Sequence, residues 1–138
     1  MALWTSADRV RAAIDAVVAT RGITLQQYNV LRILRGAEPD GLPTLAIGER
    51  MIERTPGITR MIDRLEAKGL VARERRSGDR RCVHVKISRT GLELLAGLDR
   101  KIDAADRGAF ATLSDAELSR LTELLERVRD AHESESGR

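Results

Sequence analysis

The side chains best suited to chemistry in this chain are arginines and threonines spaced for nucleic-acid recognition. Residues 55–67 place Thr59, Arg60 and Arg64 on the outward side of an amphipathic helix. The opposite stripe of that helix carries Ile58, Met61, Ile62 and Leu65. Guanidinium and hydroxyl groups donate hydrogen bonds to phosphate oxygens and to base edges. This spacing predicts a helix that packs with one face and reads DNA with the other.

The start of this reading helix is predicted at Thr55 and Pro56. A threonine side chain can accept an N–H of the first turn, and proline at the first helical position loses no needed donor. With Pro56 and Gly57 in place, the first turn also offers free backbone N–H groups to a phosphate. The helix should end near Lys68 and Gly69, because glycine commonly closes a helix C-terminus.

Two short strands should follow, joined by a turn. The first should begin at Leu70 or Val71, and the alternation from Cys82 to Ile87 predicts the second. The face expected to be buried carries Val83, Val85 and Ile87, and the other face carries Cys82, His84 and Lys86. A reading helix followed by such a hairpin is typical of a winged helix-turn-helix.

The turn between these strands concentrates positive charge, and its Ser-Gly-Asp segment consists of residues that are common in tight turns. The arginines of a surface hairpin can simply be exposed to solvent. The distribution of charge along this chain instead indicates that they bind a negatively charged partner. Residues 50–89 carry twelve Lys/Arg and five Asp/Glu, a net charge of +7, whereas residues 1–49 and 90–138 carry 0 and −4. Such a module is typical of proteins that bind a phosphate backbone. The predicted DNA contacts are Thr55, Pro56, Gly57, Thr59, Arg60, Arg64, Arg76, Arg80 and Arg81.

The elements before the reading helix are also helical in pattern. A helix over residues 24–36 should begin with a capping box between Thr24 and Gln27. A shorter helix should span residues 44–51, and residues 52–54 should connect it tightly to the reading helix. The residues expected to face inward on the shorter helix and its end are Leu45, Gly48 and Ile52. The fold class is therefore mainly α with a small β-hairpin wing.

Apolar stripes at both ends of the chain predict dimerisation. They lie on a helix over residues 6–20, on a long helix from Ser88, and on a helix that begins with a capping box between Ser114 and Glu117. These stripes could pack only on their own domain, but together they exceed what a small winged helix needs. The predicted dimer contacts are Val10, Ile14, Val17, Leu118, Leu121, Leu125 and Val128. The predicted organisation is a single domain (1–138), with a DNA-binding lobe (about 24–89), a dimerisation region (about 1–20 and 90–133) and a flexible tail (134–138).

Composition limits the class of protein. The chain has 138 residues, 42% of them hydrophobic, but only one Trp, one Tyr and one Phe, so the core should be aliphatic. No apolar run approaches the roughly 20 residues of a membrane span, and no signal-peptide pattern is present, so we expect a cytoplasmic protein. The one cysteine, Cys82, cannot form an internal disulfide.

Several segments together resemble the MarR family of bacterial transcriptional regulators. The order of elements agrees, as do three segments: Leu25–Leu31 (LQQYNVL), Arg64–Val71 (RLEAKGLV) and Asp79–Arg81 (DRR). The resemblance covers nearly the whole chain, and its most specific part is RLEAKGLV with the DRR wing at the right distance behind it.

This resemblance implies a homodimer that binds a pseudo-palindromic operator, usually as a repressor, and often releases DNA on binding a small phenolic or anionic effector or on cysteine oxidation. It places Thr55, Gly57, Thr59 and Arg60 in the major groove, Arg64 near phosphate, and Arg81 in the minor groove. We add the hypothesis that Asp79 braces the wing by pairing with a neighbouring arginine.

Other functions have weaker support in the sequence. Tyr28 and Trp4 are the only rings near the family's effector pocket, and Tyr28 fits a core role better. Cys82 and His84 share a strand face, but two ligands are too few for a metal, so no metal or cofactor is expected. No catalytic constellation or glycine-rich phosphate loop is present, which argues against an enzyme. The main alternative is a winged-helix protein-interaction module, or an architectural module that binds DNA without sequence preference.

Overall fold

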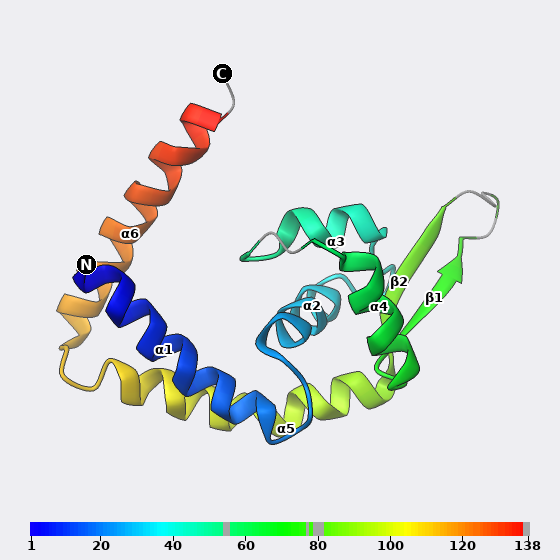
Figure 1. The fold of residues 1–138 in the computed structure, drawn as a ribbon, viewed down its shortest axis with the longest axis horizontal. Coiled ribbons are helices and arrows are strands. Elements are labelled where there is room, and N and C mark those ends of the chain that lie inside the picture. The colour runs from blue at the N-terminus through cyan, green and yellow to red at the C-terminus, as the bar shows by residue number, and fades with distance from the viewer. Residues whose placement is uncertain (54–55, 77, 79–81, 137–138) are drawn as a thin grey trace.

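A computed structural model describes residues 1–53, 56–76, 78 and 82–136, with side chains described through residue 133. In this part of the chain, six helices accompany one antiparallel two-stranded hairpin (Figure 1). The elements are α1 (Ala2–Ala19), α2 (Leu25–Gly36), α3 (Thr44–Arg50), α4 (Ile58–Ala67), β1 (Val71–Arg75), β2 (Val83–Ile87), α5 (Arg89–Ala109) and α6 (Asp115–Ser136). The predicted fold class is confirmed.

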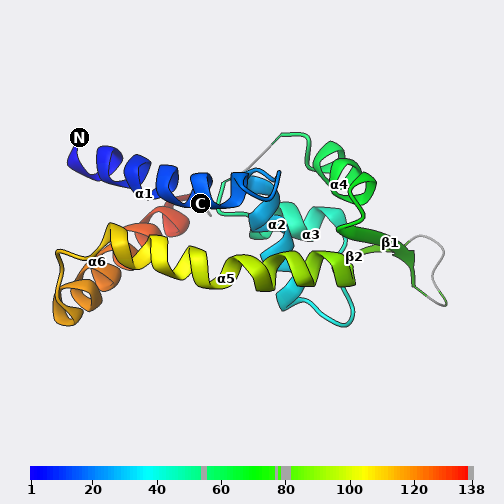
Figure 2. The same cartoon turned by 90° about the horizontal axis from the view of Figure 1, so that it is seen from below.

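Helix α5 runs between the two ends of the molecule and connects them (Figures 1 and 2). Helix α1 packs along α5, and α2 contacts both of them as well as β2 and α3. The hairpin lies at one end of the molecule beside α4, while the N-terminus and α6 lie at the opposite end. In the described part of the chain, no helix has the length and apolarity needed to cross a membrane.

The core is aliphatic, as predicted. Its fully buried side chains come from α1, α2, α3, α4, the hairpin and α5, and the largest include Leu31, Leu34, Ile47, Leu65 and Leu95. Among the buried side chains of the described residues, Tyr28 is the only Phe, Tyr or Trp. Burial of each such aliphatic side chain contributes about 1.5–3 kcal/mol, so this core supplies most of the free energy that favours folding. The buried side chains all lie between Val18 and Ile102, so none of the described side chains of α6 belongs to it.

Two predicted capping boxes are confirmed. In α2, the Gln27 N–H donates to Thr24 Oγ1 at 3.1 Å, and the Thr24 N–H donates to Gln27 Oε1 at 3.0 Å. In α6, Ser114 and Glu117 exchange the same pair of bonds, each at 3.2 Å. Ser88 accepts the Gly91 N–H at 3.0 Å and so caps α5. Side-chain oxygens at these positions satisfy N–H groups that the helix cannot pair.

Some predicted bounds differ from the structure. Helix α1 begins at Ala2, four residues before the predicted start, and α6 continues through Ser136, into the segment expected to be a flexible tail. Helix α4 ends at Ala67, two residues before Gly69, and β1 begins at Val71, both as predicted.

The inward face predicted for α3 is wrong. Leu45 and Ile52 are 80% and 84% exposed, and Gly48 is only half-buried. Ile47 and Met51, four residues apart and therefore one turn apart, are buried instead. The helix ends before Met51, where the backbone turns extended (ψ 142°), so the periodicity does not continue to Ile52.

The predicted alternation of β2 holds only for part of the strand. Val85 and Ile87 are buried, as expected, but Val83 is exposed and His84 is buried. The loop before α3 is the cause, because it runs along the edge of β2 that β1 does not occupy. There, Leu42 pairs with Val85 through two backbone hydrogen bonds of 3.0 and 2.8 Å, and His84 Nδ1 lies 3.0 Å from the Asp40 carbonyl oxygen.

Candidate nucleic-acid interface

Helix α4 presents two faces of opposite chemistry. Ile62 and Leu65 are fully buried, whereas Thr59, Arg60 and Arg64 are exposed. The predicted orientation of the helix is therefore confirmed. Neither guanidinium forms a hydrogen bond or ion pair with a described residue, so both are available to an external acceptor.

The predicted start of the reading helix is wrong. Helix α4 begins at Ile58 with Gly57 as its N-cap residue, and the first helical bond runs from the Met61 N–H to the Gly57 carbonyl at 3.1 Å. Gly57 has a φ of +84°, a left-handed conformation that an α-helix cannot contain and that glycine adopts without a Cβ clash. Exposed Pro56 therefore lies before the helix, and Thr55 is outside the described residues.

Arg73 of β1 ties the wing to α4, a link that the sequence reasoning missed. Its NH2 group lies 2.7 Å from Asp63 Oδ1 and its NH1 group 3.0 Å from Glu66 Oε1. Its backbone N–H also donates to Glu66 Oε2 at 3.0 Å. The hydrogen bond to Asp63 raises the pKa of the Arg73 guanidinium, although partial burial opposes the shift. The i, i+3 spacing of the two acids on the outer face was the signal available in the sequence.

The wing itself is only partly described. Arg76 is exposed, and its guanidinium lies 3.4 Å from Asp40 Oδ1, so this predicted DNA contact has an internal acidic neighbour. Asp79, Arg80 and Arg81 lie outside the described residues, so their predicted roles are not tested.

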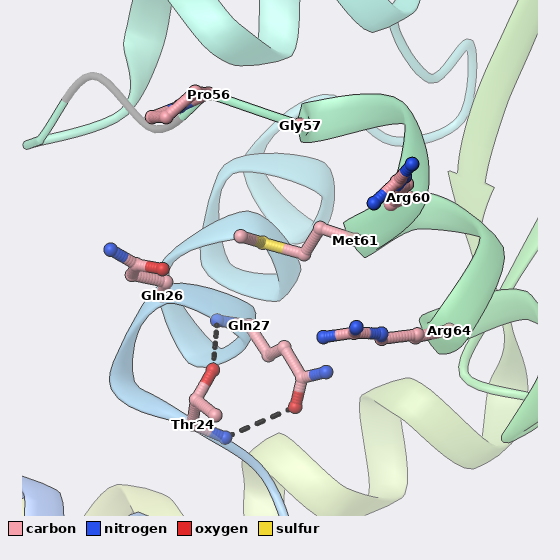
Figure 3. A pocket seen from close by; sticks show the side chains of 8 residues that line it. All are labelled: Thr24, Gln26, Gln27, Pro56, Gly57, Arg60, Met61 and Arg64. Carbon is pink, nitrogen blue, oxygen red and sulfur yellow. Dashed lines mark hydrogen bonds between the residues drawn. The ribbon is translucent and has the colours of Figure 1, made fainter.

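A hollow of about 480 Å³ separates the outer face of α4 from the start of α2 (Figure 3). It is lined by Thr24, Gln26, Gln27, Pro56, Gly57, Arg60, Met61 and Arg64. Five of these, the last five, lie in or just before the reading helix. In Figure 3 the Arg64 side chain extends from α4 towards the carboxamide of Gln27. Four predicted DNA contacts, Pro56, Gly57, Arg60 and Arg64, are thus brought together with three residues of α2 and its cap that were not predicted.

The predicted dimer contacts fall into two groups. On α1, Val10 is half-buried, and Ile14 and Val17 pack partly against the protein's own core. On α6, Leu118 and Leu121 are half-buried, whereas Leu125 and Val128 are 43% and 54% exposed. Trp4 and Leu3 at the start of α1 are 74% and 55% exposed.

Tyr28 lies in the core and does not line the hollow. It is 6% exposed, its ring centroid is 5.9 Å from the Arg32 guanidinium carbon, and burial raises its pKa from the ordinary 10.0. Cys82 is a partly exposed free thiol. Within the described residues, no group of three or more His, Cys, Asp or Glu side chains is placed to hold a metal ion.

Comparison with known proteins agrees with this geometry. The model of the MarR family matches residues 23–83. A MarR transcription factor from Planctomyces limnophilus is 38% identical, with 90% of each chain covered and a TM-score of 0.70.

Two relatives have names that refer to operons. The homoprotocatechuate degradative operon repressor of Escherichia coli is 26% identical over 126 residues, 91% of this chain and 84% of that protein. A transcriptional regulatory protein for the hcr operon of Thauera aromatica is 30% identical over 112 residues, 81% of this chain but only 66% of that relative's length. The chain belongs to the MarR family, and it is a DNA-binding transcriptional regulator.

Proposed function

We propose that this regulator is a homodimeric repressor that binds a pseudo-palindromic operator and is released by a small-molecule effector. The observation that carries the proposal is that two surfaces of different chemistry lie at opposite ends of the molecule. Arginines on α4 that have no partner among the described residues lie at the hairpin end, and exposed apolar side chains of α1 and α6 lie at the other end (Figure 1). The first surface suits a phosphate backbone, and the second suits another copy of the chain.

The dimer half of the proposal rests on α6. Below its partly buried first turns, the helix has exposed Leu124, Leu125 and Val128 on a stripe that none of the core residues covers. Removal of one such side chain from water is worth about 1.5–3 kcal/mol, so several of them on each copy supply a substantial driving force. We therefore assign residues 1–20 and 90–133 to dimerisation and residues 24–89 to DNA binding.

The operator half of the proposal follows from symmetry. Two copies related by a two-fold axis would present two α4 helices to successive major grooves, about 34 Å apart along the duplex. Arg60 would then contact base edges, Arg64 a phosphate, and the wing arginines Arg80 and Arg81 the flanking backbone and minor groove. Such a protein would act at the chromosome, in the cytoplasm.

The sign of regulation and the effector are supported by relatives. The Escherichia coli relative is named as a repressor, which favours repression here. The resemblance to the MarR family favours a small phenolic or anionic effector, and contact of that effector with Tyr28 stays a prediction.

The experiment is a selection of genomic fragments by the purified protein at physiological salt, with the oligomeric state measured by sedimentation equilibrium. We expect one inverted repeat, bound by a dimer. Arg60→Ala should weaken that site by about 1–3 kcal/mol while binding to random duplex changes little. Salt-sensitive binding with no sequence preference would instead support the architectural alternative, and salt-insensitive binding to a protein would support the interaction module.

A further inference from the structure

The turn that leads into the reading helix has little apolar support of its own. Met51 at its start is buried and Ile58 in the first turn of α4 is half-buried, but no described residue between them is buried. A Cβ added at Gly57 would meet no described atom within 4 Å, so this part of the chain is not closely packed. The path of the turn therefore depends on polar contacts with other elements.

Contacts from α2 and α1 reach this turn. Asn29 Oδ1 of α2 accepts the Ile52 N–H at 3.0 Å. The Arg11 guanidinium of α1 forms an ion pair with the Glu53 carboxylate. We propose that Arg11 is a positioning residue for DNA recognition, which fixes the approach to α4 through Glu53 and thereby places Arg60 against the bases. The inference rests on the proposed function, because it names a residue that orients the reading helix at the operator.

The part of α4 that this ion pair can displace is the part that carries Arg60. Ile62 and Leu65 are fully buried, so the core fixes the middle of the helix. Arg60 lies before them, in the first turn, which follows the left-handed backbone of Gly57. A group that recognises its target must be held within roughly 0.5 Å and 10–20° of the productive geometry. A small shift of the first turn should therefore weaken contacts with base edges more than contacts with phosphates, which carry no sequence information.

The other end of α4 has a link to the same part of the molecule. Lys68 Nζ, just after the helix, donates to the Gly22 carbonyl at 2.6 Å, in the turn that follows α1. The core holds α4 by one apolar stripe, and a helix held in this way can still pivot about its buried residues. Polar links to α1 at one end and to the turn after α1 at the other oppose such a movement.

A charge swap tests the ion pair without a change in net charge. Arg11→Glu and Glu53→Arg each replace attraction with repulsion, and the double variant restores a pair of opposite orientation. These side chains are 50% and 43% exposed, so none of the three variants disturbs the core. The matched control is Arg9→Glu combined with Glu53→Arg, which has the composition and net charge of the swap. Arg9 is exposed and, because residues two apart on a helix do not share a face, it cannot replace Arg11.

The readout is the ratio of affinities for the selected operator and for a random duplex of the same length, measured on the full chain by fluorescence anisotropy at fixed salt. The ratio removes the effect of net charge, which acts on both duplexes. We expect each single reversal and the Arg9 control to lower the ratio about fivefold, the affinity equivalent of a partly exposed ion pair. The swap should return it to within about twofold of wild type. The Tm should change little in all variants, because the pair is half-exposed.

A second measurement asks whether Arg11 acts through Arg60. In an Arg60→Ala background, Arg11→Glu should lower the ratio no further, because the contact that it misplaces has already been removed. An equal further fall in that background would overturn the inference. The inference is also wrong if the single reversals keep the wild-type ratio, or if the swap and the Arg9 control give the same ratio, and DNA recognition then stands without it. If the wild-type protein binds the operator no better than the random duplex, the proposed function itself fails.

Discussion

Replacement of Arg73 with methionine should lower the stability of the protein and also its affinity for DNA. The guanidinium of Arg73 holds both Asp63 and Glu66, the two acids on the outer face of α4, at 2.7 and 3.0 Å. Methionine keeps most of the apolar stem but removes the charge and both hydrogen bonds. The wing would lose its link to the reading helix, and two carboxylates would stand unpaired beside the phosphate backbone.

The expected loss of stability follows from how far the three charged side chains are exposed to solvent. The side chain of Arg73 is 26% exposed, and those of Asp63 and Glu66 are 58% and 43% exposed. An exposed ion pair is worth about 0.2–1 kcal/mol, and two partly shielded pairs should together contribute about 1–2 kcal/mol. For a chain of this size, that loss corresponds to a fall in Tm of roughly 3–6 °C. Each unpaired carboxylate at about 10 Å from a phosphate adds about 0.4 kcal/mol of repulsion in water, so the two together should lower DNA affinity about fourfold at low salt.

The assay combines thermal unfolding by circular dichroism with anisotropy titrations of DNA at two salt concentrations. The triple variant Arg73→Met, Asp63→Asn, Glu66→Gln separates charge from mechanical support. If Arg73 acts by neutralising the acids, the triple variant should recover DNA affinity while its Tm stays low. If it acts by holding the wing, the triple variant should bind DNA as weakly as Arg73→Met. An Arg73→Met protein with wild-type Tm and wild-type affinity at low salt would refute the reasoning altogether.

Three further predictions test other parts of the structure. At Gly41, where φ is +68°, an added Cβ would lie 2.3 Å from the Val85 carbonyl oxygen. Gly41→Ala should therefore destabilise the protein by about 1–3 kcal/mol and speed hydrogen exchange of the Val85 N–H. Unchanged exchange would contradict this close approach. The double variant Leu125→Glu, Val128→Glu should sediment as a folded monomer, and a dimer of wild-type affinity would exclude this stripe from the interface. Burial raises the pKa of Tyr28, so phenolate absorbance, which reports the only tyrosine, should titrate with a midpoint above 10.0. The stability that this shift contributes is fully present below the pKa of Tyr28 in the unfolded protein, and it is lost as the pH rises through the pKa of Tyr28 in the folded protein. A midpoint at or below 10.0 would show that the ring is not desolvated.

The sequence by itself determined the local features of this protein. The spacing of Ile58, Met61, Ile62 and Leu65 fixes which face of α4 is buried, because the helical period alone decides it. The capping boxes at Thr24 and Ser114 involve residues three apart, so their hydrogen bonds follow from adjacency in the chain. The family segments and the net charge of residues 50–89 were sufficient to indicate a DNA-binding regulator.

The tertiary structure decided how distant segments meet. The loop at Asp40–Leu42 pairs with the edge of β2 and brings the Asp40 carbonyl to His84, and no periodicity within β2 could reveal this contact. The left-handed backbone of Gly57 moved the start of α4, although Thr55-Pro56 has the residue types of a helix start. The contact of Arg73 with Asp63 and the hollow at Gln27 both join separate elements, so they depend on chain path rather than on local preference.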